Sequence, residues 1–236
     1  MAQGKNIAII GGDGKLGQAI HKLADPSYHI VNLPRNARYP LSVLHSADVI
    51  VVAVPAKEFN KVYPLVLAAN RHAIIATTGH AWPENIDSIL YERGITWVHS
   101  KNFAFDMQPI RHQISELGRK LRDQDIAARA TLTETHDVKK QDRPSGTALL
   151  WRDWLGIDKI QVRSRRIAGA LPKHRLKVTF NDQNIVITHE AKSRRIYAEG
   201  ILWTAAQIAE DHIHMKGLVL FERLQDQLHP LPQLRP

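Results

Sequence analysis

The sequence predicts an α/β protein: an N-terminal Rossmann-like, parallel doubly wound domain, then a second α+β domain with a mixed or antiparallel sheet. Three observations lead to this prediction. Short apolar runs alternate with segments of helical spacing up to about residue 105. Two of these runs, 47–55 and 73–79, are too apolar to have a solvated face, which is typical of inner parallel strands. Beyond residue 105, β-rich segments follow one another at hairpin spacing.

In the first half, strands and helices are expected to alternate. Residues 5–10 form an apolar run that ends in glycines, and residues 15–24 then have helical spacing. Further strands are expected at 28–33, 47–55, 73–79 and 95–100, and further helices at 57–70 and 84–93. Short connections between such elements indicate βαβ units and therefore a parallel sheet.

The second half begins with a predicted helix at 107–121, followed by an alternating strand at 128–136 and a short helix at 148–156 closed by Gly156. Four β-rich segments are expected at 159–169, 174–180, 183–191 and 194–202, and the last thirty or so residues return to helix. We therefore predict a dinucleotide-binding domain over 1–106, with 203–236 packing back onto it. A substrate-binding and oligomerisation domain is predicted over 107–202.

The composition narrows the class of protein. The chain of 236 residues contains no cysteine, which excludes disulfides, thiolate zinc sites and cysteine nucleophiles and is compatible with a reducing cytoplasm. No apolar run approaches the roughly 18 residues that span a bilayer, so no membrane association is expected. The net charge of +9 favours an anionic partner, and much of the excess lies in 163–166 and 173–177.

A glycine-rich loop follows the first strand and opens the first helix. Gly12, Gly14 and Gly17 satisfy G-x-G-x-x-G in the context where this pattern binds a dinucleotide pyrophosphate at a helix N-terminus. The second strand ends without the acid typical of NAD-binding domains. Arg35 stands there instead and suits a 2′-phosphate, so we favour NADPH over NADH. The residues expected to bind the cofactor in this region are Gly11, Gly12, Asp13, Gly14, Lys15, Leu16, Gly17 and Arg35.

Two further stretches carry polar groups at places where ligands bind. The first ends a buried strand at the carboxyl edge of the sheet, where it could border a nicotinamide; it consists of Ala76, Thr77, Thr78 and Gly79. The second is 134–150, in which Ser145 can cap a helix whose first amides point at an anion, and Gly146 allows close approach. His136 and Lys140 lie just upstream and could donate a proton. A capped helix with a polar approach loop would account for the same residues.

The pattern E-x-H-x-x-x-K-x-D-x-P-S-G-T-A at 134–148 resembles the signature of the dihydrodipicolinate reductase family, also called 4-hydroxy-tetrahydrodipicolinate reductase. The glycine loop, the 76–79 stretch and the final segment 187–200 are similar to further family motifs. The Lys-Asn-Phe step resembles the family's Asn-Phe step, which adds Lys101, Asn102 and Phe103 to the expected cofactor contacts. The likeness runs in order over nearly the whole chain.

The resemblance implies a cytoplasmic oxidoreductase of lysine and diaminopimelate biosynthesis, usually a homotetramer assembled through its β domain. Hydride would pass from NADPH or NADH to a cyclic unsaturated dicarboxylate. His136 would be the catalytic histidine and Lys140 the proton donor. The expected substrate contacts are Asp137, Ser145, Gly146, Thr147 and Arg194.

The departures from the family pattern, which include the residues after the Asn-Phe step at 104–108, concern the substrate more than the reaction. Asp137 stands where the family usually has a second histidine, Ala76 replaces a glycine, and His80 replaces an aromatic or aliphatic residue. Another NADP-dependent reductase or dehydrogenase with a different anionic substrate is therefore an alternative. A nucleotide-sensing or nucleic-acid-binding protein is a second one, disfavoured because neither basic run contains an aromatic residue. No acid–histidine set has metal-ligand spacing along the chain, so no catalytic metal is predicted.

Overall fold

The computed structural model describes residues 5–35 and 37–228, and the chain divides into two compact units. Unit 1 comprises residues 1–105 and 194–236, and unit 2 comprises residues 106–193. Residues 229–236, which the sequence analysis assigns to the first domain, lie outside the described residues. None of the described helices is long and apolar enough to cross a membrane.

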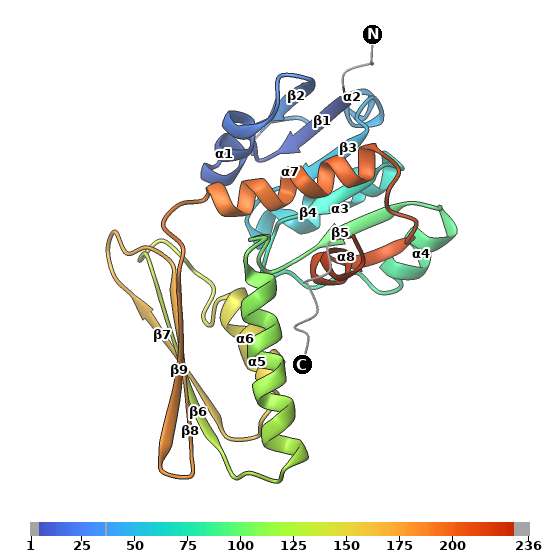
Figure 1. Cartoon of the computed structure of the whole chain (residues 1–236). Coiled ribbons are helices and arrows are strands. Elements are labelled where there is room, and N and C mark those ends of the chain that lie inside the picture. The colour runs from blue at the N-terminus through green and yellow to red at the C-terminus, as the bar shows by residue number, and fades with distance from the viewer. Residues whose placement is uncertain (1–4, 36, 229–236) are drawn as a thin grey trace. The chain divides into compact units, whose positions relative to one another are not determined.

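Unit 1 is built on a six-stranded sheet of order β10-β5-β4-β3-β1-β2, in which every neighbouring pair is parallel. Its strands are β1 (Lys5–Ile10), β2 (Tyr28–Leu33), β3 (Val49–Val52), β4 (His72–Ile75), β5 (Thr96–His99) and β10 (Gly217–Leu220). The helices are α1 (Lys15–Leu23), α2 (Leu41–His45), α3 (Ala56–Ala68), α4 (Ile86–Glu92), α7 (Arg195–Ala209) and α8 (Phe221–Leu228) (Figure 1).

Both faces of this sheet are covered. Residues of β1 alternate between two apolar clusters: Ile10 packs with Phe59 of α3 and Leu90 of α4, whereas Ile9 packs with residues of α1, α7 and α8. The sheet is therefore doubly wound, with α2, α3 and α4 on one face and α1, α7 and α8 on the other. The predicted Rossmann-like class is confirmed.

Two local predictions in the C-terminal part are wrong. The segment 194–202, expected as a strand, lies at the start of helix α7 and thus in unit 1. The buried face of this part of α7 consists largely of small residues. A Cβ at Gly200 would lie 1.8 Å from the carbonyl oxygen of Phe103, so a larger residue there would clash. Residues 217–220, expected as helix, form strand β10 beside β5, because a short apolar run can serve either structure and tertiary pairing decides.

Unit 2 contains a four-stranded mixed sheet of order β7-β6-β8-β9 and two helices. Its elements are α5 (Met107–Asp123), β6 (Arg129–His136), α6 (Gly146–Leu155), β7 (Ile160–Arg166), β8 (Lys173–Phe180) and β9 (Gln183–Glu190). Strand β6 pairs parallel with β7 and antiparallel with β8. Helices α5 and α6 pack closely, since a Cβ at Gly118 would lie 1.9 Å from the carbonyl oxygen of Leu155. The predicted mixed sheet is confirmed.

Candidate active site

Strand β6 aims alternate side chains at the interior of unit 2. Ala130, Leu132, Glu134 and His136 are buried, as the period of two along a strand requires. The last two are polar, and His174 of β8 lies directly across from Glu134 in the antiparallel register. Glu134 is 0% exposed, His136 6% and His174 2%. A polar cluster therefore occupies one end of an otherwise apolar core.

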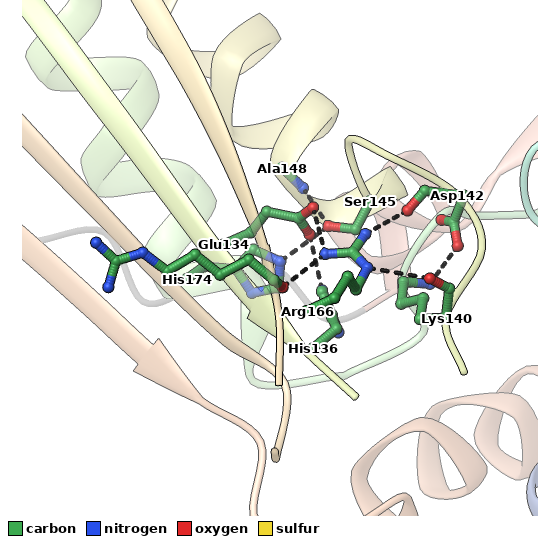
Figure 2. Close-up of polar contacts among 9 residues, drawn as sticks. Glu134, His136, Lys140, Asp142, Ser145, Ala148, Arg166 and His174 are labelled. Atoms are coloured by element: carbon green, nitrogen blue, oxygen red, sulfur yellow. Dashed lines mark hydrogen bonds and ion pairs between the residues drawn. The ribbon is translucent and has the colours of Figure 1, made fainter. Parts of the chain in front are cut away.

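Glu134 is the only acid of this buried cluster among the described residues and is bound from two sides. Its Oε2 lies 2.9 Å from Nε2 of His136, and its Oε1 accepts a hydrogen bond of 3.0 Å from Nη1 of Arg166 (Figure 2). Burial alone would raise the pKa of Glu134, but hydrogen bonds from neighbouring side chains, His136 first among them, hold this pKa well below its usual range. The carboxylate is therefore ionised and fixes the orientation of the His136 ring.

Ser145 connects this cluster to helix α6. Its Oγ accepts a hydrogen bond of 3.3 Å from the amide of Ala148 and lies 3.1 Å from Nε2 of His174. The helix begins at Gly146, so the amides of Gly146 and Thr147 lie in its first turn, where an N-terminus attracts anions. The predicted serine cap is confirmed, and its hydroxyl ties the helix end to the buried histidine.

Lys140 lies in the loop 137–145 between β6 and α6. Its Nζ forms an ion pair of 2.9 Å with Oδ1 of Asp142, and both side chains are about one-third exposed (31% and 30%). Asp137 shapes the same loop: its carboxylate accepts hydrogen bonds from the amides of Lys139 at 2.9 Å and Gly169 at 2.7 Å. The acid that departs from the family pattern therefore binds backbone amides in this structure.

Glu134, His136 and His174 also form a group with ligand atoms within 4.8 Å of one another, close enough to hold a metal ion. This group is not apparent from spacing along the sequence, because its third member comes from β8 by cross-strand pairing. The guanidinium of Arg166 already pairs with the same carboxylate. A metal cation bound there would be repelled by this positive charge. Our expectation that the reaction uses no metal thus stays a prediction.

The burial of His174 leads to a testable pH dependence. Burial, and next the nearby His136, lowers the pKa of His174 from 6.5 to about 3. Because the folded state binds this proton less tightly than the unfolded state, the stability that neutral His174 contributes is present above pH 6.5 and is lost as the pH falls towards 3. Between about pH 6.5 and 4.5 we expect a loss of about 2–3 kcal/mol in the free energy of unfolding.

Urea denaturation at a series of pH values measures this loss, with His174→Gln as the comparison. The variant should show a clearly smaller fall in unfolding free energy over the same range. Parallel curves for the wild type and the variant would contradict the prediction, because the acid sensitivity would then come from other groups, such as His99 in unit 1, whose burial lowers its pKa to about 4.

In unit 1, the glycine loop 11–17 joins β1 to α1 in the predicted place. Gly11 has a φ of +88°, and its amide donates to the carbonyl of Leu33 at 2.8 Å. A Cβ at Gly17 would lie 2.5 Å from Cα of Gly12, so the last glycine of the motif lets the helix pack onto the turn. Lys15, Leu16 and Gly17 form the first turn of α1, whose amides can receive a pyrophosphate.

Arg35 follows strand β2 and is bound to the glycine loop. Asp13 accepts hydrogen bonds from both the amide of Arg35, at 3.0 Å, and its Nε, at 3.1 Å. Arg35 also lines a pocket of about 860 Å³ together with Arg38, Tyr39, Glu58 and Lys61. Three of these five side chains are cationic and one is acidic, so the pocket favours an anionic group.

The remaining predicted cofactor residues lie at the carboxyl edges of β4 and β5. Thr77 is buried and donates to the carbonyl of Val54 at 2.9 Å, and Gly79 has a φ of +78°. Asn102 accepts from the amide of Ala104 at 2.8 Å, and Phe103 packs against Phe221. Ala76, Thr78 and Lys101 belong to the same two segments. Thr77, Asn102 and Phe103 thus have structural contacts of their own.

The predicted substrate and catalytic residues are divided between the two units. His136, Asp137, Lys140, Ser145, Gly146 and Thr147 all belong to unit 2, whereas Arg194 belongs to unit 1, at the N-cap of α7. Glu134, Arg166 and His174 were not among the site residues predicted from the sequence. The alternation of Glu134 with His136 was a usable signal. The other two become visible only with the strand register.

The sequence is similar to known proteins. A family model described as "Dihydrodipicolinate reductase, C-terminus" matches residues 110–223. A 4-hydroxy-tetrahydrodipicolinate reductase of Xylella fastidiosa (strain 9a5c) is 25% identical over 220 residues, which cover 86% of this chain and 91% of the relative. A corresponding reductase of strain M23 is 24% identical over 220 residues, covering 86% and 92%.

Solved structures share the fold. A dipicolinate-bound dihydrodipicolinate reductase from Paenisporosarcina sp. TG-14 superposes with a TM-score of 0.69 at 18% identity, covering 93% of this chain and 99% of the other. GenD2 from gentamicin A biosynthesis, solved in complex with NAD, gives a TM-score of 0.59 at 14% identity, covering 100% and 89%.

Proposed function

We propose that this chain is a member of the dihydrodipicolinate reductase family and that it reduces 4-hydroxy-tetrahydrodipicolinate to tetrahydrodipicolinate with NADPH as hydride donor, using His136 and Lys140 at the substrate. The observation that carries the residue assignment is the junction of β6 and α6 in unit 2. There, a buried ionised carboxylate orients His136, and Lys140 lies in the connecting loop before a capped helix N-terminus.

The chemistry of the substrate explains why these groups are needed. Hydride addition to a conjugated ring leaves an enamine that must be protonated, and a lysine ammonium is a suitable donor. We assign this role to Lys140, whose Nζ is held by Asp142 at 2.9 Å. With Nε2 of His136 directed at Glu134, Nδ1 is the ring nitrogen that can meet the substrate.

Binding of a dicarboxylate also needs positively polarised groups that bind its two carboxylates. The amides of Gly146 and Thr147, in the first turn of α6, suit one carboxylate, and Ser145 keeps that helix end in place. That the Paenisporosarcina reductase was solved with dipicolinate bound supports a planar dicarboxylate as the ligand class. Arg194 would contribute a second cation. Asp137 would act through the loop rather than on the substrate, because its carboxylate binds the amides of Lys139 and Gly169.

The cofactor would lie on unit 1, with its pyrophosphate at the start of α1 and its adenosine end near Arg35. When bound, the nicotinamide supplies the hydride. The lining of the pocket that contains Arg35, Arg38 and Lys61 supports a 2′-phosphate and hence NADPH. Asp13 holds Arg35 close to the glycine loop, where the ribose would come.

Arg35→Ala tests this cofactor assignment. We expect the KM for NADPH to rise about tenfold, since one charge-assisted hydrogen bond to a phosphate is lost, and the KM for NADH to change less than twofold. Steady-state rates with each cofactor measure the effect, and NADH is the internal control. An equal rise for both cofactors would mean that Arg35 shapes the loop instead of reading the 2′-phosphate.

We also propose a homotetrameric assembly and a cytoplasmic location. A homotetramer formed through unit 2 is supported by the edge strand β9, which exposes Ile185 and Val186 at 36% and 45%. Light scattering coupled to gel filtration would determine the number of subunits. A role in lysine and diaminopimelate biosynthesis fits the cytoplasm.

One assay tests the reaction and the site together. NADPH oxidation is followed by absorbance, with enzymatically generated 4-hydroxy-tetrahydrodipicolinate and the purified protein. We expect rapid oxidation that His136→Ala abolishes. Tight NADPH binding without turnover would support the cofactor assignment and contradict the substrate assignment. Retention on heparin that falls steeply with salt, without turnover, would favour the nucleic-acid-binding alternative.

A further inference from the structure

Arg166, the last residue of β7, differs from the other arginines of its run. Within the basic segment 163–166, Arg163 and Arg165 point to solvent, whereas the side chain of Arg166 is only 3% exposed. The alternation of a strand separates them onto opposite faces of the sheet. Arg166 is also the register partner of His136 in the parallel pair β6–β7. Because burying a charged guanidinium costs free energy unless its donors are bound, Arg166 needs acceptors within the protein.

The guanidinium of Arg166 joins the strand to the loop that follows it. Nη1 donates to Oε1 of Glu134 at 3.0 Å, Nε donates to the carbonyl of Lys140 at 3.0 Å, and Nη2 donates to the carbonyl of Asp142. Figure 2 shows the side chain lying between these three acceptors. One planar fork thus fixes a buried carboxylate and two backbone carbonyls at once.

These bonds matter because they reach the middle of the loop, between the contacts of Asp137 at its start and those of Ser145 at its end. Residues 137–145 form no helix or strand. Near Lys140, the amide of this residue donates to the carbonyl of Asp137 at 3.0 Å, and Asp137 binds the amides of Lys139 and Gly169. Those contacts close a turn at the start of the loop. The contacts of Arg166 tie Lys140 and Asp142 to Glu134, and through Glu134 to His136.

We propose that Arg166 is a positioning residue that holds the Lys140 loop in register with His136 for proton transfer, without touching the substrate. This inference rests on the proposed roles of Lys140 and His136. A lysine in its place would keep the charge, but its single nitrogen lacks the planar fork by which the guanidinium reaches Glu134, Lys140 and Asp142 from three separate nitrogens. Misplacement of a catalytic group by about 1 Å can cost on the order of a hundredfold in rate.

The kinetic test compares Arg166→Ala and Arg166→Lys with Arg165→Ala, whose side chain is exposed on the same strand. We expect kcat to fall about a hundredfold in Arg166→Ala, with the KM for NADPH and for the dicarboxylate changing less than threefold. Added guanidinium should restore part of the rate to Arg166→Ala, and Arg166→Lys should be intermediate. Arg165→Ala should match the wild type. A large rise in the KM for the dicarboxylate with kcat retained would instead make Arg166 a substrate ligand and overturn the proposal.

A second measurement does not depend on turnover. Amide hydrogen exchange in 137–145, followed by mass spectrometry, should speed up about tenfold or more in both Arg166 variants and stay unchanged in Arg165→Ala. Circular dichroism checks that each variant is folded. If Arg166→Ala does not fold, the exchange rates of Arg166→Lys test the proposal. Unchanged exchange in a folded Arg166 variant would overturn the proposal. If the wild type does not reduce the substrate, the proposed function fails, and the exchange rates still decide whether Arg166 holds the loop.

Discussion

Lys140→Ala is expected to lower kcat about a thousandfold while leaving NADPH binding nearly unchanged. The side chain removed is the proposed proton donor, and general acid catalysis of this kind contributes roughly 10²–10⁴ to a rate. The ion pair that is lost, Lys140 with Asp142, has both members about one-third exposed, so the cost in stability should be below about 1 kcal/mol. A large rate effect with a small stability effect is the signature of a chemical role.

Stopped-flow rates and fluorescence titration of NADPH measure the two quantities. Lys139→Ala is the matched control, because Lys139 is the preceding residue in the same loop and has no proposed chemical role; it should retain most of the rate. Equal losses of turnover and NADPH affinity in Lys140→Ala would show that the residue supports the cofactor or the fold, and the assignment of the proton donor would then be wrong.

The parallel sheet and the glycine loop could be predicted from the sequence because both depend on local patterns. The apolar composition of the strands is enough to predict that they are buried. Gly12 and Gly17 approach each other within a single βα turn. The serine cap at Ser145 is equally local. These features need no knowledge of which strands pair.

The centre of the candidate site could be predicted only in part, since it depends on strand register. Glu134 and His136 share a face by alternation along one strand. The parallel pairing of β6 with β7 sets Arg166 beside them, and the antiparallel pairing with β8 sets His174 opposite. In the sequence these two residues look like members of basic surface runs. Only the first half of helix α7 was predicted wrongly, as a strand: its buried residues include Ala198 and Gly200, so its apolar periodicity is weak.

Glu134→Ala should have the largest effect on stability of any change considered in unit 2. Removing the carboxylate leaves the guanidinium of Arg166 buried without its acid, and such a loss costs about 3–5 kcal/mol in the free energy of unfolding. The ring of His136 loses its partner at the same time, so turnover should also disappear.

The double variant Glu134→Ala/Arg166→Met separates the cost of an unpaired charge from the cost of lost packing. Replacing both members of a buried pair by apolar groups is often close to neutral, so we expect the double variant to regain at least half of the lost stability without regaining activity. Urea denaturation measures both variants. Glu190→Ala, which breaks the exposed pair with Lys173, is the control and should change stability by less than about 1 kcal/mol. If the double variant were as unstable as Glu134→Ala, the carboxylate would stabilise unit 2 through its other hydrogen bonds, and the ion pair with Arg166 would not be the dominant contribution.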